Sequence, residues 1–241
     1  MARHSHWHNI QLTKGKADAK RAQSFAKLAK SLTAAAKEGG SDPAFNVSLR
    51  MAMDAARAAN MPKDNIDRAI ACATGEGAEG VSIEEILYEG FGPGGSALLI
   101  QCLTDNRNRS VTEVRTIMNK NGGTMASPGS VKWLFEKKGV VIIQDIFLIP
   151  DREAFELALI EAGAEDFIQV NFGLEIRTPL TDFKSVLDTL ETFGIYPGVA
   201  AIEHLAKDPV ELAKGDRELL HRLVDKLEEL DDVETVFTNE E

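Results

Sequence analysis

Two groups of basic residues are placed where they could bind the phosphates of a nucleic acid. The first lies near the N-terminus and comprises Lys14, Lys16, Lys20, Arg21, Lys27 and Lys30. The second is the pair Arg107 and Arg109, within the run Asp-Asn-Arg-Asn-Arg at 105–109. Lysine and arginine side chains neutralise phosphates and release counterions, which supplies affinity without reading base sequence. These eight residues are the predicted nucleic-acid-binding site.

The distribution of charge supports this interpretation although the net charge, taken alone, does not. The chain carries −11 with histidine neutral. Residues 1–40 hold eight Lys or Arg against two acids, a charge of +6, so the remaining residues carry −17. A polyanion is attracted to the first part and repelled by the second, which would orient any complex.

The sequence lacks the common motifs of catalysis and cofactor binding. No G-x-S-x-G, H-E-x-x-H or P-loop is present. Residues 75–80 match G-x-G-x-x-G, but they follow a helical pattern and precede a strand pattern, and their two glutamates would repel a pyrophosphate. This segment is interpreted as a linker. We therefore expect no enzymatic activity, no cofactor and no small-molecule substrate.

The histidines, cysteines and acidic pairs are interpreted as residues without a catalytic or metal-binding role. His4, His6 and His8 alternate around Trp7 and could bind a metal ion, but a polar arm is the favoured interpretation and no metal site is predicted. Cys72 and Cys102 belong to no C-x-x-C pair and suit reduced thiols in a cytoplasmic protein. No 18-residue apolar run and no apolar signal region is present, so neither a membrane partner nor secretion is expected. Pairs such as Glu228-Glu229 and Asp231-Asp232 are expected at a solvated helix end.

Helical periodicity dominates the first eighty residues. A helix is predicted over 16–38, with Phe25, Leu28 and Leu32 on its apolar face and the lysines opposite. Asp42-Pro43 resembles an N-cap and first turn, and it predicts a second helix to about residue 59. Pro62 opens a third helix, to residue 73. Residues 1–80 are therefore predicted to form a small basic domain of three helices.

Strand patterns follow at 85–91 and 97–103, joined by a glycine-rich turn. Ser110 and Glu113 suggest a capping box that starts a helix over 111–121. Arg107 and Arg109 would then lie in the preceding loop, beside unpaired N–H groups that favour an anion. Alternatively, the loop is structural: Asp105 pairs with one arginine and the asparagines cap turns. A further strand is expected at 131–135.

Residues 139–205 alternate strand, helix, strand, strand, helix and strand, which is the ferredoxin-like order. Helix 216–230, with Leu219, Leu220 and Leu223 among its inward residues, and strand 233–237 are assigned back to residues 81–138. The predicted fold class is α+β. It comprises a helical domain at 1–80, a central α/β domain at 81–138 plus 206–241, and an inserted domain at 139–205.

Many short blocks of the sequence resemble the YebC/PmpR family with their spacing preserved. They are His4-Ser5-His6-Trp7, Asn9-Ile10, Asp18-Ala19-Lys20-Arg21, Gly39-Gly40 with Asp42-Pro43, 60–66, Tyr88-Glu89-Gly90, 92–95, 105–109 with Glu113-Val114-Arg115, Gly122-Gly123, Gly129-Ser130-Val131 and 162–166. The resemblance runs essentially end to end. It implies a three-domain crescent in which a helical domain precedes two α/β domains, one inserted in the other.

The resemblance also implies a role in gene expression. The family is generally described as DNA-binding transcriptional regulators, whereas other members look like translation factors on ribosomes. These include the mitochondrial translational activator of cytochrome c oxidase and proteins that relieve stalling at proline runs. This chain departs from the family at Arg3, His6 and Gln11-Leu12, where the family has glycine, lysine and Lys-His. The loss of one or two cations predicts a shallower salt dependence of binding.

Three functional hypotheses follow. The first is a DNA-binding regulator of transcription. The second is a ribosome-associated factor that contacts ribosomal RNA and relieves stalled translation. The third is a protein-interaction scaffold that uses the acidic body. The helices at 43–59 and 62–73 are rich in alanine and offer few side chains for base edges, so recognition of phosphates and shape is better supported than base reading.

Overall fold

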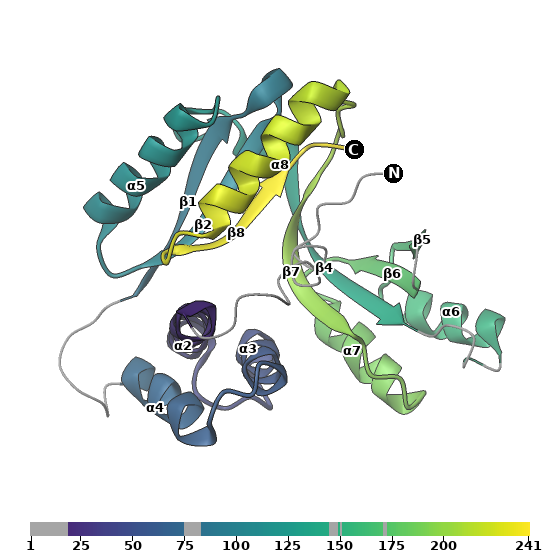
Figure 1. The fold of residues 1–241 in the computed structure, drawn as a ribbon. Helices are drawn as coiled ribbons and strands as arrows, with labels where there is room; N and C mark the ends of the chain where they lie inside the picture. The colour runs from purple at the N-terminus through teal and green to yellow at the C-terminus, as the bar shows by residue number, and fades with distance from the viewer. Residues whose placement is uncertain (1–18, 75–82, 145–148, 150, 171–172) are drawn as a thin grey trace. The chain divides into compact units, whose positions relative to one another are not determined.

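The structure is a computed structural model that describes residues 19–74, 83–144, 149, 151–170 and 173–241, with the backbone alone for 19–23 and 74. The chain divides into two compact units (Figure 1). The first holds the residues up to Phe135 together with Ala206–Glu241, and the second is Glu136–Leu205. The insert that the sequence predicts, 139–205, therefore lies inside the second unit.

The first unit begins with three helices, as predicted: α2 (Ala19–Gly39), α3 (Val47–Ala58) and α4 (Lys63–Thr74). Leu32, Leu49 and Ile66 are buried between them, one from each helix. The buried Thr33 hydroxyl of α2 donates to the Ala69 carbonyl of α4 at 2.9 Å. Small alanines complete this core, which lets the three helices approach closely.

The start of α3 differs from the prediction. Asp42 does not cap this helix, because residues 43–45 form a turn and α3 begins at Val47. The N-cap is Asn46, whose side-chain oxygen accepts from the Leu49 N–H at 3.0 Å. Asp42 instead accepts from the Ala44 N–H and so stabilises the turn.

The rest of the first unit is a four-stranded sheet with the order β3-β1-β2-β8. The strands are β1 (Glu84–Phe91), β2 (Ala97–Thr104), β3 (Thr124–Met125) and β8 (Val233–Thr238). A turn, η1 (Pro93–Gly95), joins β1 to β2, which pair antiparallel from Glu84↔Thr104 to Phe91↔Ala97. Strands β2 and β8 also pair antiparallel.

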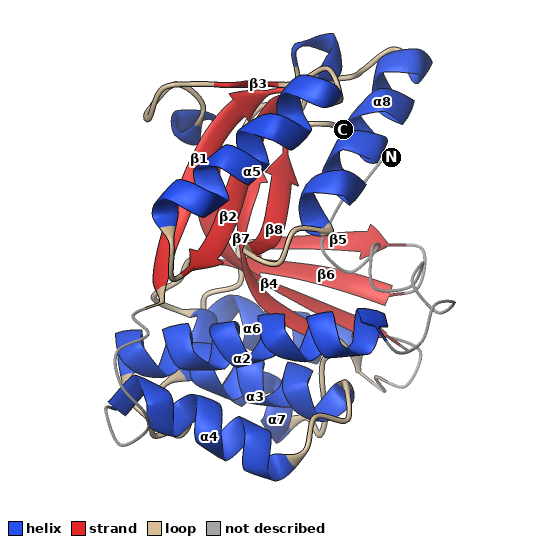
Figure 2. Cartoon of the chain, turned by 60° about the vertical axis from the view of Figure 1, so that its left-hand side comes forward, coloured by secondary structure: helices blue, strands red, loops and turns tan. Residues whose placement is uncertain are grey.

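Helices α5 (Arg107–Lys120) and α8 (Lys214–Glu228) cover one face of this sheet (Figure 2). Alternate residues of β2 face them: Leu98, Ile100 and Cys102 are fully buried against the two helices. Ala97 and Leu99, which alternate with these residues along the strand, point to the opposite face, where they pack with Val131, Phe135 and Phe237. The period of two along β2 therefore gives the sheet two cores.

Three local predictions in this unit are wrong. Helix α5 begins at Arg107, four residues before the predicted start, so Ser110 and Glu113 form no capping box. The expected strand at 131–135 is a 3-10 turn, η2 (Lys132–Leu134), followed by β4. Leu219 is exposed, although its neighbours Leu220 and Leu223 are buried as expected.

The second unit has the predicted order of elements: β4 (Phe135–Gln144), α6 (Arg152–Glu161), β5 (Asp166–Val170), β6 (Gly173–Thr178), α7 (Phe183–Thr192) and β7 (Val199–Ala206). Its four strands lie in the order β5-β6-β4-β7, the arrangement of a ferredoxin-like sheet. Phe155 and Leu159 of α6 and Val186 and Leu190 of α7 are fully buried. None of the helices in the described ranges is long and apolar enough to cross a membrane.

Candidate nucleic-acid interface

The predicted basic residues of the N-terminal segment are only partly visible. Lys14 and Lys16 lie outside the described residues. Lys20 and Arg21 lie in the first turns of α2, where only the backbone is described. Of the predicted lysines on this helix, Lys27 and Lys30 are described with their side chains.

Lys27 is bound by the chain itself. Its ammonium group donates to the carbonyl oxygens of Glu228 at 2.5 Å and Val233 at 2.8 Å. The Glu228 carbonyl is at the C-terminal end of α8, where carbonyls lack helical partners and a cation is favoured. Burial lowers the pKa of Lys27 below its usual value, and nearby acids such as Glu234 only partly offset this. Lys27 therefore acts as a cap for α8.

Lys30 makes a similar set of contacts one turn later. Its ammonium group donates to the Asp231 carbonyl at 3.0 Å and to Asp232 Oδ1 at 2.6 Å. The neighbouring Ser31 hydroxyl donates to Glu234 at 2.8 Å. The sequence placed the lysines of this helix opposite its apolar face, as residues that bind phosphates. Lys27 and Lys30 instead lie against the turn between α8 and β8.

Asp232 is the centre of this contact. Its side chain is 2% exposed, and it accepts from Lys30, from the Thr104 hydroxyl at 2.9 Å and from Arg109 Nη2 at 2.8 Å. Burial alone would raise the pKa of this carboxyl, but the hydrogen bonds that it accepts outweigh burial and hold the pKa below its usual range. The sequence predicted a solvated acidic pair at this position, and for Asp232 that prediction is wrong.

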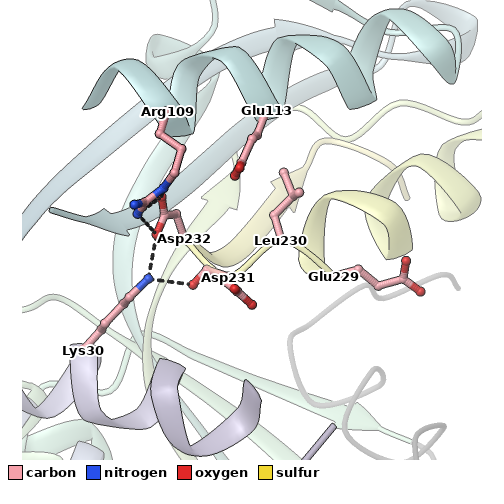
Figure 3. Close-up of a pocket in the computed structure, with 7 residues that line it drawn as sticks. All are labelled: Lys30, Arg109, Glu113, Glu229, Leu230, Asp231 and Asp232. Atoms are coloured by element: carbon pink, nitrogen blue, oxygen red, sulfur yellow. Dashed lines mark hydrogen bonds and ion pairs between the residues drawn. The ribbon is translucent and has the colours of Figure 1, made fainter. Parts of the chain in front are cut away.

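A hollow of about 480 Å³ opens beside Asp232 (Figure 3). The residues that line it are Lys30, Arg109, Glu113, Glu229, Leu230, Asp231 and Asp232. Four carboxylates against two cations make this hollow unsuited to a phosphate. Figure 3 shows both cations turned toward Asp232.

Arg109 therefore follows the structural alternative that the sequence left open. Its guanidinium lies 2.7 Å from Asp105 as well as 2.8 Å from Asp232. Asn106 is the N-cap of α5, since its side-chain oxygen accepts from the Arg109 N–H at 3.1 Å. Both arginines are exposed, but two carboxylates already compensate the charge of Arg109. Of the predicted pair, Arg107 is the one that no described carboxylate pairs.

Helix α5 presents a second group of polar residues that the sequence reasoning missed. Its exposed side chains at helical spacing, here called the α5 face, are Asn108, Thr112, Arg115, Thr116 and Asn119, with Arg107 and Lys120 exposed at its two ends. The helix has four basic residues and one acid, Glu113, which lines the acidic hollow. Among the described residues, no hydrogen bond or ion pair engages the side chains of Arg107 and Arg115. This face offers cations and hydroxyl or amide groups together, the set that proteins use for phosphate contacts.

Three contacts hold α5 on the sheet. The Asn106 N–H donates to the Thr104 hydroxyl at 3.0 Å, at the end of β2. The Tyr88 hydroxyl of β1 lies 2.8 Å from the Ser110 hydroxyl. Val114 and Met118 are fully buried on the opposite side of the helix. The α5 face therefore lies on a helix that is fixed to the sheet. Its polar residues at 108, 112, 115 and 119 are three or four positions apart, and this spacing in the sequence already indicated one polar side of a helix.

The remaining candidate groups give no site within the described residues. Cys72 is exposed and Cys102 is buried, with no disulfide between them. Burial raises the pKa of the Cys102 thiol to about 12. No group of three or more His, Cys, Asp or Glu in the described part could hold a metal ion. The histidines at 4, 6 and 8 and the linker at 75–80 lie outside the described residues.

Comparison with known proteins identifies relatives along the whole chain. A protein from Caldanaerobacter subterraneus named a probable transcriptional regulatory protein is 44% identical, over 100% of this chain and 98% of its own length. A protein of the same name from Trichlorobacter lovleyi is 47% identical, over 99% of this chain and 95% of its own. The crystal structure of a conserved hypothetical protein from Aquifex aeolicus matches with a TM-score of 0.85 and 38% identity, covering 98% of this chain and 97% of that chain.

Two family models divide the sequence between them. The TACO1/YebC protein N-terminal domain matches residues 5–76, and the TACO1/YebC second and third domain matches residues 83–240. The second match starts just before β1 and ends within two residues of the chain end. Together with the relatives above 40% identity, these matches show that the chain belongs to the TACO1/YebC family, which includes the YebC/PmpR proteins.

Proposed function

We propose that this protein is a DNA-binding regulator of transcription in the cytoplasm, and that it acts by binding rather than by catalysis. The names of its relatives, probable transcriptional regulatory proteins, support a regulatory role. The absence of catalytic motifs from the sequence is consistent with a role in binding.

The α5 face is the observation that carries this proposal. It is exposed and holds Arg107 and Arg115 without acidic partners among the described residues, in a chain whose net charge is −11. An acidic protein gains nothing in solubility from a cationic helix face, so a polyanionic ligand is the natural reason for it. The other predicted basic residues of the N-terminal segment, Lys14, Lys16, Lys20 and Arg21, would add further phosphate contacts.

A second candidate, a ribosome-associated translation factor that binds ribosomal RNA, is favoured by a separate observation. The exposed charges of α4 are balanced, with Lys63 and Arg68 against Asp64 and Asp67. On α3, Arg57 pairs with Asp54 at 2.9 Å. Neither helix presents the array of amide and arginine side chains that reads base edges. Phosphate and shape recognition, which suffices for structured RNA, needs no such array.

Charge reversal on α5 tests the common part of both candidates. We expect the double variant Arg107→Glu with Arg115→Glu to bind duplex DNA at least about tenfold more weakly, because two phosphate contacts become repulsive. The matched control is Lys214→Glu with Arg222→Glu, which makes the same charge change at exposed positions of α8. Equal losses in the two double variants, measured by fluorescence anisotropy, would show a general charge effect and refute the proposed interface.

Cross-linking in cells separates the two candidates. The protein is cross-linked to bound nucleic acid in cells with ultraviolet light and purified under denaturing conditions. The nucleic acid that remains attached to it is then sequenced. Recovery of promoter DNA that depends on Arg107 and Arg115 would support the transcriptional role. Recovery of ribosomal RNA fragments with the same dependence would replace it with the translational one.

A further inference from the structure

The sheet of the first unit has a second face, turned away from α5 and α8. Along β1, Leu87, Glu89 and Phe91 alternate onto this face, where Leu87 packs beside Leu99 and Phe237. Much of the face is covered by the chain itself, through the segment at 126–134. Phe91, at the end of the strand, remains 43% exposed.

The segment at 126–134, here called the Glu89 loop, is held in one conformation by a buried carboxylate. Glu89 is 6% exposed and accepts from the backbone N–H groups of Gly129 at 2.6 Å, Val131 at 2.6 Å and Lys132 at 2.8 Å. Gly129 has φ of +87°, a conformation that favours glycine. Val131 is fully buried and packs against the sheet, which anchors the loop. The loop is therefore rigid although it contains no long helix or strand.

The Glu89 loop displays an indole ring. Trp133 is 64% exposed, and its Nε1–H donates to the Ser130 carbonyl at 3.0 Å. This hydrogen bond satisfies the polar atom of the ring and fixes its orientation, so that the ring has little conformational entropy to lose when a ligand stacks on it. Trp133 therefore presents an ordered aromatic ring to solvent.

The charge around Trp133 selects the kind of ligand. Lys132 is exposed next to it, and Lys207 is joined to its other neighbour by a hydrogen bond from the Lys207 N–H to the Leu134 carbonyl at 2.9 Å. Residues 121–135 contain no Asp or Glu. An exposed aromatic ring flanked by cations is the arrangement that binds single-stranded nucleic acid, where the bases stack and the phosphates pair with cations.

We propose that Trp133 is a stacking site for an unpaired nucleobase, with Lys132 contacting an adjacent phosphate. This inference deepens the proposed function and rests on it, because it adds single-stranded nucleic acid to the ligands of the same regulator. It places the unpaired strand on the face of the sheet opposite α5. Bases of DNA and RNA stack alike, so the ligand class is a single strand of either sugar.

Fluorescence of Trp133 tests the inference directly. The chain has two tryptophans, so Trp7→Phe leaves Trp133 as the sole indole emitter. In this background we expect short single-stranded oligonucleotides of DNA and RNA to quench the emission on binding. We expect Trp133→Ala to weaken single-strand binding by about 5- to 150-fold, as loss of one stacked base does, and Trp133→Phe to retain most of the affinity. Phe45→Ala, which removes another aromatic side chain that is 85% exposed, is the control and should change nothing.

The inference and the function on which it rests fail in distinguishable ways. If duplex DNA binds and depends on α5, but Trp133 emission is unchanged at saturation with single strands, the stacking site is refuted and the proposed function stands. The same conclusion follows if Trp133→Ala binds single strands as tightly as the parent. If neither duplex nor single strand binds, both proposals are refuted. Because Trp133 is exposed, its variants are expected to melt within a degree or two of the parent.

Discussion

At the scale of single residues, Asp232 connects segments that are distant in the sequence. Its carboxylate accepts from Lys30 on α2, Thr104 at the end of β2 and Arg109 on α5. The sequence suggested only a solvated acid, because nothing near position 232 shows that three donors converge on it from elsewhere in the chain. Such convergence depends on tertiary contacts and has no local signal.

Asp232→Asn should therefore lower the stability of the first unit. The amide keeps the size of the side chain but loses the charge that three donors share, and we expect the free energy of unfolding to fall by about 2 kcal/mol. This loss is smaller than for a fully buried ion pair, because Arg109 and Lys30 are partly exposed to solvent. The control is Asp225→Asn, an exposed acid of α8. Equal urea midpoints for the two variants would contradict the assigned role of Asp232.

Glu203 gives a prediction about pH in the second unit. It is 5% exposed, and burial, with the nearby charge of Glu175, raises its pKa to about 7 from an ordinary 4.5. Between these values the folded state holds a proton that the unfolded state has lost. The contribution of this group to stability is therefore complete below about pH 4.5 and is lost as the pH rises through 7.

Glu203→Gln should remove this dependence. We expect the variant to be more stable than the parent at pH 8, by up to about 2–3 kcal/mol, and similar to it at pH 5. Thermal unfolding at the two pH values measures the difference. A variant that is shifted equally at both pH values would show that the titration of Glu203 is not the cause.

At the scale of elements, periodicity predicted most of the helices and strands, but not all of their starts. The strand expected at 131–135 is a turn, and the short strand β3 was not predicted. The apolar positions of α2, α8 and β2 repeat at 3.6 or 2 residues and define these elements locally. Caps were predicted wrongly at two places. Asp42 and Asn46 are both good caps, and the choice is made by the Ala35 and Gly40 carbonyls that bind the Asn46 amide at 2.7 Å. Ser110 was assigned as a cap but is instead buried against Tyr88 of another element.

Asn46→Ala should consequently destabilise the helical bundle more than Asp42→Ala. Asn46 caps α3 and donates to two carbonyls of the preceding segment, so we expect a loss of about 2–3 kcal/mol. Asp42 is exposed and supports only a turn, for which we expect less than about 1 kcal/mol. Chemical denaturation followed by helical circular dichroism distinguishes the two. A larger effect at Asp42 would restore the cap that the sequence suggested.

At the scale of the whole molecule, the chain uses part of its N-terminal positive charge internally. Lys27 and Lys30 lie more than 200 positions from the α8–β8 turn that they bind, so no sequence pattern announced the contact. The α5 face was only half found, because Arg107 and Arg109 were recognised as a motif while Arg115 and the polar residues between them were not. The candidate interface therefore moves from α2 toward α5.

Lys27→Ala separates the structural use of α2 from its proposed use in binding. We expect a loss of about 1–2 kcal/mol of stability, because two carbonyls at the end of α8 lose their donor. We expect duplex affinity to change by less than about twofold, since this ammonium group is already engaged. A variant of normal stability that binds DNA much more weakly would place the interface on α2 instead.

The salt dependence of duplex binding tests the central claim most directly. The logarithm of the dissociation constant is measured against the logarithm of salt concentration for the parent, for Arg107→Ala with Arg115→Ala, and for Lys214→Ala with Arg222→Ala. If the α5 face binds phosphates, the slope should fall by about 1.8 in the first double variant, at about 0.9 per phosphate, and stay unchanged in the second. Equal slopes for all three proteins would contradict the claim that α5 is the nucleic-acid interface.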